Sequence, residues 1–519
     1  MIMGILLIAL AASDSLPEGD SLPVFRVSEV IATASLPGAR AESLSVEGDP
    51  ARSLRDFGLY DYGGMVTPGF SGLPSRHTAV FINGVPLNSP ATGTVDLSLL
   101  PMVNRGLLTL SGPSRIELWL PESPKLSLGA GSLGLASAEG FALWGPTLWG
   151  ISYRRADNCY RYTDEFGRSW RRVNSDESRL AGAWVLRQGN LSAFVLASAT
   201  ERGSPGPIGF PTPSARLSDT LALGSVSYKG LMLFGVREAT TYADAPALSR
   251  TIAEKAGGVY SKGNLVIEAG RERALGIGIS RAKAQAVLVR KGWFCRAGAM
   301  AWDGPKALRG FLVSDAGVSS SYIRAMVFCD AVPPAINDLA WPDDGFSVGN
   351  PALRPEITWG GEAGFELPWL SLWASAKLVE DYIAWVPGDR WTPLNLDRVA
   401  APEVGASLSA GFAEVKASWN PVRWGGKRLA HLPDWRASAG ASLGYFRLYL
   451  NYTGPRLTTP GGLRELPGFF LADAGLSLSK ERFGADFWVY NLFDETPQQI
   501  AGYPLPGRRF TLEITWRSR

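Results

Sequence analysis

The sequence predicts an all-β transmembrane barrel of about 22 antiparallel strands, with a small N-terminal α/β plug domain inside its lumen. Three observations lead to this expectation. Apolar and polar residues alternate in segments of ~9–12 residues from about residue 146 to the end. Amphipathic helical periodicity is nearly absent, and a chain of 519 residues is too long for one ordinary soluble core.

The last strand shows the alternation clearly. Phe510, Leu512, Ile514 and Trp516 alternate with threonines and Glu513. Because side chains on a strand point alternately to its two faces, we assign the first set to lipid and the second to the lumen. This segment is expected to close the barrel against its first strand.

Composition supports a closed β architecture but leaves an alternative. The chain has 59 Gly and 18 Trp, which suits tight turns and aromatic girdles at the two membrane interfaces. A soluble protein of several sheets would also explain the alternation. Lys and Arg (51) nearly balance Asp and Glu (48), so the charge gives no reason to expect a nucleic-acid partner.

The N-terminus resembles an export signal. A dozen apolar residues are followed by Asp14, which is the length of a signal h-region and too short for a membrane helix. We therefore expect a signal peptide at 1–13, with a buried N-terminal strand as the alternative. Cys159, Cys295 and Cys329 are far apart, and small buried residues are favoured over a Cys295–Cys329 disulfide.

The rest of the chain divides by its pattern. Residues 14–37 are expected to form a periplasmic tether, residues 38–145 the plug, and residues 146–519 the barrel. The plug region has short mixed elements and turn-rich joins instead of long alternating segments.

Catalytic motifs are weak. Gly129, Gly131 and Gly134 have the spacing of a dinucleotide loop, but no helical pattern follows them. Ser442 lies in a GxSxG spacing inside an alternating strand, where a nucleophile elbow would not form. With only His77 and His431 in the chain, we expect no enzyme activity, no cofactor and no multi-histidine metal site.

Three stretches resemble the TonB-dependent outer-membrane receptors. They are "FSGLPSRHTAVFINGVPLNSPATGTVDLSLLP" (70–101) in the plug, and "NPALRPEITWGGEAGFE" (350–366) and "NLFDETPQQIAGYPLPGRRFTLEITW" (491–516) in the barrel. The resemblance implies a Ton box, a short segment that adds as a strand to the sheet of TonB. We place it at Ser28, Glu29, Val30, Ile31, Ala32, Thr33 and Ala34, with the first plug strand as the alternative.

The resemblance also implies ligand contacts from two apical plug loops. The candidates are Tyr60, Asp61, Tyr62, Gly63 and Gly64 in one loop, and Asn88, Ser89, Pro90, Ala91, Thr92, Gly93 and Thr94 in the other. Glu356 and Glu362 occupy the barrel motif. Plugs of the family usually carry Arg where this chain has Ser71 and Ser111, so these carboxylates need other partners or solvent.

The expected function is a TonB-dependent receptor of the outer membrane with a periplasmic N-terminus. It would bind an external ligand, a metal chelate such as a siderophore or cobalamin, and import it with energy from TonB and its inner-membrane complex. The alternative is a passive or structural barrel that has lost energy coupling. The partners implied are TonB, outer-membrane lipid and the small-molecule ligand.

Overall fold

The structure is a computed structural model of the chain. It describes residues 26–27, 30–31, 41–45, 59–61 and 65–518, except for gaps at 71, 104, 110–113, 165–166, 245–246, 263–264, 276–278, 291–292 and 304–307. The signal peptide assigned to residues 1–13 lies outside the described residues.

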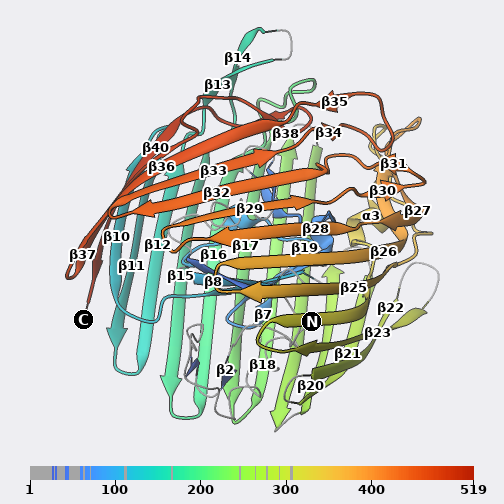
Figure 1. The fold of residues 1–519 in the computed structure, drawn as a ribbon, viewed down its shortest axis with the longest axis horizontal. Coiled ribbons are helices and arrows are strands. Elements are labelled where there is room, and N and C mark those ends of the chain that lie inside the picture. Colours follow the sequence, from blue (N-terminus) through green and yellow to red (C-terminus); the bar gives the residue numbers. More distant parts are fainter. Residues whose placement is uncertain are drawn as a thin grey trace.

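Within these residues, 22 antiparallel strands form one closed barrel (Figure 1). This confirms the predicted fold class. The strands are β10 (Lys125–Gly131), β11 (Ala136–Trp144), β12 (Thr147–Ala156), β15 (Glu177–Gln188), β16 (Leu191–Gly203), β17 (Arg216–Tyr228), β18 (Leu231–Asp244), β19 (Ala247–Lys262), β20 (Leu265–Leu275), β21 (Ile279–Arg290), β22 (Trp293–Asp303), β23 (Leu308–Ser319), β24 (Ile323–Val332), β25 (Glu356–Leu367), β26 (Leu370–Val386), β28 (Glu403–Ser409), β29 (Ala413–Trp419), β32 (Trp435–Leu443), β33 (Phe446–Thr453), β36 (Phe469–Lys480), β37 (Phe483–Tyr490) and β40 (Arg509–Arg517).

Short elements continue the barrel at one end, which we call the long-loop end. They extend the sheet or lie in the connections, and β13 and β14 project beyond the ring of strands (Figure 1). These elements are β13 (Tyr160–Thr163), β14 (Ser169–Arg172), α3 (Ile336–Ala340), β27 (Thr392–Ala400), β30 (Arg423–Trp424), β31 (Lys427–Arg428), β34 (Arg456–Leu457), β35 (Glu465–Leu466), β38 (Gln498–Ile500) and β39 (Tyr503–Pro504). At the opposite, short-turn end, hairpins such as β11–β12 are joined by only a few residues.

The barrel closes as the sequence predicts. β40 pairs with β10, the first barrel strand, and Ile514 lies opposite Leu128. Phe510, Leu512 and Ile514 are 53%, 44% and 51% exposed, as expected of side chains that face lipid. Glu513 faces the lumen, where it accepts a hydrogen bond from the hydroxyl of Ser127. Both assigned faces of this strand are therefore confirmed.

The barrel begins earlier than the sequence analysis places it. β10 and β11 belong to the closed sheet, so the wall starts at Lys125 and not at residue 146. Gly129, Gly131 and Gly134 lie in or beside this first hairpin and form no dinucleotide loop. The alternation is weak in this hairpin because small residues, Ala136, Ala138, Gly140 and Ala142, occupy the outward face of β11.

The plug contains a five-stranded sheet in the order β3-β8-β9-β6-β7. Its only parallel pair among the described strands is β6–β9. The described plug elements are β1 (Arg26–Val27), β2 (Val30–Ile31), β3 (Ala41–Ser45), β4 (Leu59–Asp61), β5 (Val66–Pro68), η2 (Ser75–His77), β6 (Thr78–Ile82), β7 (Val85–Pro86), η3 (Leu97–Leu99), β8 (Arg105–Thr109) and β9 (Ser114–Trp119). In this part of the plug the helices are single 3-10 turns, so the α component of the prediction is not seen there.

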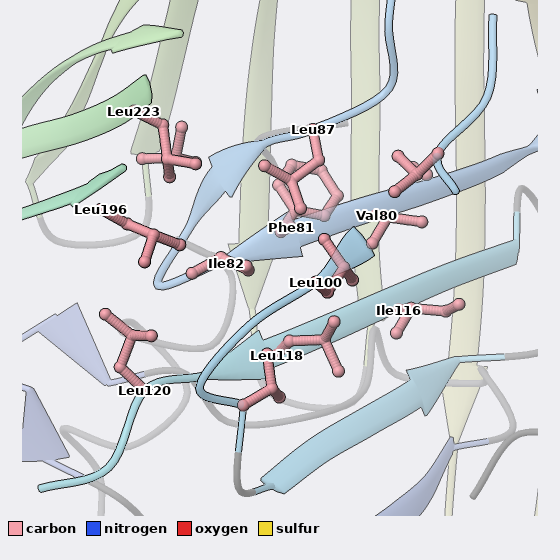
Figure 2. Close-up of a cluster of buried hydrophobic side chains, with 14 of the residues drawn as sticks. Val80, Phe81, Ile82, Leu87, Leu100, Ile116, Leu118, Leu120, Leu196 and Leu223 are labelled. Carbon is pink, nitrogen blue, oxygen red and sulfur yellow. The ribbon is translucent and has the colours of Figure 1, made fainter. Parts of the chain in front are cut away.

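The plug core is continuous with one side of the barrel. Val80, Phe81 and Ile82 of β6 pack with Leu118 of β9 and are fully buried. Figure 2 shows these plug residues beside Leu196, whose side chain comes from the barrel wall. Burying such side chains stabilises the fold by about 1.5–3 kcal/mol each. The same apolar core therefore folds the plug and attaches it to the wall.

Glycines in the wall make room for large lumen-facing rings. A Cβ atom on Gly475 of β36 would lie 2.6 Å from the Trp488 ring on the neighbouring strand. In the plug, Gly72 has a φ of +70°, and a Cβ atom there would overlap Asn420 of the barrel. Part of the high Gly content thus serves close approach inside the lumen.

The positions of Cys159, Cys329 and Ser442 can be compared with the expectations from the sequence. Cys329 is buried as expected, whereas Cys159 is only half-buried. Ser442 lies in β32, a regular strand, and not in a strand-to-helix turn. Among the described residues, no helix has the length and apolar character needed to cross a membrane.

Candidate functional site in the barrel lumen

An arginine of the plug is bound by two carboxylates of the barrel. Arg76, in η2, lies 2.8 Å from Asp338 of α3 (Nη1 to Oδ2) and 3.6 Å from Glu356 of β25 (Nε to Oε2). Burial alone would lower the pKa of the Arg76 guanidinium, but these two carboxylates offset burial and raise its pKa above the ordinary value. We call Arg76, Asp338 and Glu356 the plug lock.

His77 completes the surroundings of Glu356. Its Nε2 lies 3.2 Å from Oε2 of Glu356, at ion-pair distance but without hydrogen-bond geometry. The other carboxylate oxygen accepts a hydrogen bond of 2.8 Å from the backbone N–H of Ile383. Glu356 is fully buried, so its charge depends on these partners.

Glu362 has a different role. Its carboxylate pairs with Arg324 of the neighbouring strand β24 at 2.5 Å, so it binds wall to wall instead of wall to plug. The two carboxylates of the barrel motif therefore both have arginine partners. Ser71 and Ser111, which stand where family plugs usually carry Arg, lie outside the described residues.

Arg76 is a partner of Glu356 that was not predicted from the sequence, because plugs of the family usually carry arginine at two other positions, where this chain has serine. The available signal was the pair of basic residue types Arg76 and His77 inside the plug motif, directly before the buried strand β6. Asp338 could not have been found, because it pairs across 262 residues of sequence.

A second charged contact fixes η3. Asp96, the residue before η3, accepts a 2.6 Å hydrogen bond from Arg202 of β16, which also lies 3.2 Å from Asp219 of β17. Next to it, the carbonyl oxygen of Ser98 accepts a 2.6 Å hydrogen bond from Arg179 of β15. These contacts hold the plug against the same side of the barrel as the apolar core.

The apical loop at 88–94 is tied to the plug by Asn88. The Asn88 side chain accepts from the Val80 N–H and donates to the Thr78 carbonyl, each at 2.8 Å. Gly93 N–H donates to the Ser89 carbonyl at 2.7 Å, which closes the turn. The polar side chain at Asn88 therefore serves loop geometry first.

The barrel covers the same loop. The Pro90 carbonyl accepts from Ile336 N–H at 3.1 Å, and the Ala91 carbonyl accepts from Asn337 N–H at 2.9 Å. Of the residues in this loop, only Thr92 is exposed. The α3 connection thus closes over the loop, and a ligand could reach most of it only after α3 moves.

The other predicted apical loop is partly described. Tyr60 and Asp61 lie in β4, which pairs with β5 and lies next to β38 of the long-loop end. Tyr62, Gly63 and Gly64 are outside the described residues. The two candidate loops are therefore not brought together by any described contact.

The Ton box is described at two positions. Val30 and Ile31 form β2, which pairs with Arg26–Val27 of β1. Ser28, Glu29, Ala32, Thr33 and Ala34 lie outside the described residues. Its function as a Ton box stays a prediction.

A cavity of about 430 Å³ separates the plug from the wall where the barrel closes. We call the strands β10, β11, β12, β37 and β40 the seam wall. The plug contributes Leu100, Met102 and Val103, and the seam wall contributes mainly small or polar side chains, including Ser127, Gly129, Ser137, Ser152, Thr511, Glu513 and Thr515.

The cavity extends along the height of the wall. Lys125 and Arg517, which pair at the short-turn end, line it together with Arg509 and Asn158, which lie toward the long-loop end. It is a space between the plug and the wall, so it can widen only if the two separate.

Stacked aromatic rings stand along this side of the lumen. Trp488 stacks on Tyr490 (centroids 6.3 Å apart, planes at 17°) and on Tyr449 of β33 (5.9 Å, 26°). The Arg509 guanidinium lies 5.7 Å from the centre of the Tyr490 ring. Trp488 is buried, whereas Tyr490 and Arg509 are partly exposed and line the cavity, so this pair offers a ring beside a cation to a planar or π-rich molecule.

The loops above the seam wall are joined by one buried arginine. Arg456 of β34 donates to the carbonyls of Gly454 and Pro467 at 3.0 Å and to Gln499 at 3.1 Å. Burial, and then the charge of Arg436, lower its pKa to about 10. Burial and Arg456 also lower the pKa of His431 to about 4, so His431 is neutral at pH 7.

No described group of three or more His, Cys, Asp or Glu side chains has the arrangement to hold a metal ion. The lumen instead combines a fixed plug, a closed apical loop and a cavity along one wall. These features define a plugged transmembrane β-barrel.

Comparison with known proteins gives the family. Residues 316–492 match the family model described as TonB dependent receptor-like, beta-barrel. The matched part of the barrel is thus that of a TonB-dependent receptor.

Two curated relatives share part of the sequence. The vitamin B12 transporter BtuB of Vibrio vulnificus is 31% identical over 207 residues, and that of Photobacterium profundum is 36% identical over 208 residues. Each match covers 36% of this chain and 33% of the relative. The match thus spans about a third of the length of these curated relatives.

Solved structures share the fold over nearly the whole chain. The copper transporter OprC superposes with a TM-score of 0.69 at 14% identity, covering 94% of this chain and 100% of that one. The FrpB iron transporter from Neisseria meningitidis gives 0.69 at 12% identity, covering 93% and 100%. At such low identity these likenesses establish the fold alone.

Proposed function

We propose that the protein binds an external ligand at the long-loop end and imports it along the seam wall, using energy from TonB. The observation that carries this proposal is the cavity beside the plug, on the side where the wall contributes only Phe141 and Leu148 to the plug core. The match of residues 316–492 to the TonB-dependent receptor family supports this class of activity.

The orientation follows from the ends of the chain. The Ser518 N–H donates to the Pro124 carbonyl at 3.1 Å, so the last strand ends where the plug joins the first one. Barrels of this kind have short turns on the periplasmic side and long loops outside. We therefore propose that the short-turn end, where the plug joins the first barrel strand, faces the periplasm together with the N-terminal tether.

The ligand we propose is a metal chelate of the siderophore or cobalamin type. The matched curated relatives are named vitamin B12 transporters, and one structural neighbour is a ferric enterobactin receptor. Stacked rings and charged groups on the cavity wall suit a planar or aromatic chelate with polar edges. A chelate much larger than 430 Å³ would need the plug to move away from the seam wall.

Coupling would use Ser28–Ala34 as the Ton box. A strand added to a partner's sheet depends on main-chain N–H groups, which proline removes. The test compares Ile31→Pro with Ile31→Ala in cells, measuring uptake and surface binding of cyanocobalamin and of ferric enterobactin. Ile31→Pro should abolish uptake of the transported chelate and leave its binding intact, whereas Ile31→Ala should transport normally.

The same experiment tests the passive-barrel alternative. Equal uptake by Ile31→Pro and wild type would contradict energy coupling through this segment. Binding of neither chelate would contradict the proposed ligand class. Energy coupling through this segment would then be measured with other ligands.

A further inference from the structure

Two hairpins from distant parts of the sequence meet at the long-loop end (Figure 1). The β13–β14 hairpin follows barrel strand β12, and the β38–β39 hairpin precedes the closing strand β40. The Tyr160 hydroxyl donates a 2.5 Å hydrogen bond to the Pro504 carbonyl, and the Thr163 N–H donates to the Thr496 hydroxyl oxygen at 3.3 Å. We call the contact between these two hairpins the hairpin joint.

Arg172 of β14 is buried in this joint. It lies opposite Tyr160 in the hairpin register and is 4% exposed. Its guanidinium carbon is 5.7 Å from the centre of the Tyr503 ring of β39. Both Nε and Nη2 are buried, and neither has a hydrogen-bond partner among the described residues. The joint therefore holds a charged side chain with two unsatisfied donors.

The surroundings of Arg172 do not compensate its burial. Burial lowers the pKa of the Arg172 guanidinium, and the nearby hydroxyls of Tyr160, Tyr503 and Tyr162 offset only part of this effect. Arg76, in contrast, has two carboxylates that raise its pKa above the ordinary value. Because an arginine keeps its proton in a protein, a buried guanidinium without an anion is costly. An anion at Arg172 would therefore stabilise the closed joint.

The two unsatisfied nitrogens lie on one edge of the guanidinium. Nε–H and Nη2–H point in the same direction, and this edge binds the two oxygens of a carboxylate through parallel hydrogen bonds. Arg273 of the barrel uses the same two nitrogens to bind the Glu254 carboxylate, at 2.9 and 2.7 Å. One guanidinium balances the single charge of a carboxylate, whereas a phosphate monoester carries up to about two charges. The chemistry available at Arg172 is therefore that of a carboxylate site.

Tyrosine rings accompany the guanidinium. Tyr160 and Tyr162 are buried and lie on the same face of β13, and Tyr503 is half-buried. Aromatic rings pack favourably against one another, either offset or edge to face. A carboxylate carried on an aromatic ring would therefore use both the guanidinium and a tyrosine.

The β13–β14 hairpin also carries excess positive charge. Residues 160–172 include four arginines and two acidic residues. On the exposed face Arg161 lies directly opposite Arg171, and like charges in such a pair destabilise the two strands. This charge attracts anions toward the hairpin before they reach Arg172.

We propose that the hairpin joint binds an aromatic carboxylate. Its two oxygens would accept hydrogen bonds from Nε and Nη2 of Arg172, and its ring would pack against Tyr503. Because both nitrogens are buried in the closed joint, the ligand enters when β13–β14 separates from β38–β39. The bound anion then favours the closed form. The site lies in the loops and does not depend on the proposed import.

The test measures binding of benzoate to the purified full-length protein in detergent by ligand-detected NMR. Benzamide has the same shape without the charge, and acetate has the charge without the ring. Benzoate should bind about tenfold or more tightly than benzamide, because only the carboxylate makes charged hydrogen bonds with Arg172. It should bind about threefold more tightly than acetate, because acetate has no ring to pack. Benzoate should also slow amide exchange at residues 160–163 and 503–505, whereas benzamide should not.

Three variants separate the parts of the site. Arg172→Lys keeps the charge but lacks the paired donors, and should weaken benzoate binding about tenfold or more. Tyr503→Leu keeps every charge but removes a ring, and should weaken it about two- to tenfold. Arg155→Gln removes an exposed arginine that lies 3.6 Å from Asp157, and should leave benzoate binding unchanged.

Heat-dependent mobility in gels confirms that each variant is a folded barrel. Tyr503→Leu tests the site even if Arg172→Lys does not fold. Equal binding of benzoate and benzamide, or undiminished benzoate binding by the folded Arg172→Lys protein, would overturn the proposal. Benzoate binding that is no tighter than acetate binding, or that is unaffected by Tyr503→Leu, would contradict the part assigned to the aromatic ring.

Discussion

The two sides of the lumen contact the plug through different kinds of side chains. Strands β15 to β20 present large apolar side chains such as Leu196, Phe234 and Val259, which join the plug core. The seam wall presents small or polar residues around a cavity, and of its described residues only Phe141 and Leu148 belong to that core. The plug therefore has many apolar contacts with one wall and few with the other.

This asymmetry divides the roles of the two walls. Apolar packing and the buried charges of the plug lock are costly to break, so the attached side should remain closed at rest. Separating the plug from the seam wall would break fewer contacts. A pull on the N-terminus would then open the seam side first, where the cavity already lies.

The largest effect is expected on the seam wall itself. Leu512→Arg should prevent assembly, because it places a charge on the lipid face, whereas Thr511→Arg should be tolerated in the lumen. Heat-dependent gel mobility of membrane fractions measures the folded barrel. Loss of folding by Thr511→Arg together with normal folding by Leu512→Arg would reverse the assigned faces.

The next effect concerns the plug lock, whose carboxylates come from α3 and β25. Arg76→Ala leaves Glu356 buried with His77 as its remaining side-chain neighbour at ion-pair distance, and should destabilise plug docking by roughly 3–5 kcal/mol. Arg354→Ala removes an ion pair to Asp381 in which the arginine is 58% exposed, and should cost less than about 1 kcal/mol. Amide exchange over residues 78–99 measures the opening free energy. Equal effects of the two substitutions would show that Arg76 does not lock the plug.

The sequence predicted the barrel well because lipid on one face and lumen on the other force a two-residue period. It located the closing strand and the facing of Leu512 and Glu513. It did not locate the plug lock, because the contact of Arg76 with Asp338 and Glu356 depends on how distant segments meet. Nor did it reveal that α3 covers Pro90 and Ala91, since backbone carbonyls accept those bonds and leave no side-chain signal.

The smallest predicted effect concerns the loops above the seam wall. In the closed loops the pKa of His431 is about 4, below its ordinary 6.5, so His431 is protonated more readily when the loops open. The contribution of neutral His431 to the stability of the closed loops is complete above about pH 6.5 and is lost as the pH falls toward 4. At pH 5 loop opening should increase roughly thirtyfold.

Amide exchange over residues 427–432 and 456–458 at pH 7 and pH 5 measures this change. His431→Asn should remove most of the pH dependence, because asparagine tolerates the φ of +59° at this position and does not titrate. The same dependence in His431→Asn would assign it to another group.

The central claim is that the ligand passes between the plug and the seam wall. It is tested most directly by uptake of the transported chelate through Thr511→Trp and Leu512→Trp, two neighbouring substitutions with opposite facing. Thr511→Trp fills the cavity and should slow uptake about tenfold or more at unchanged surface binding, whereas Leu512→Trp on the lipid face should transport like wild type. Equal uptake by the two folded variants would contradict a path along the seam wall.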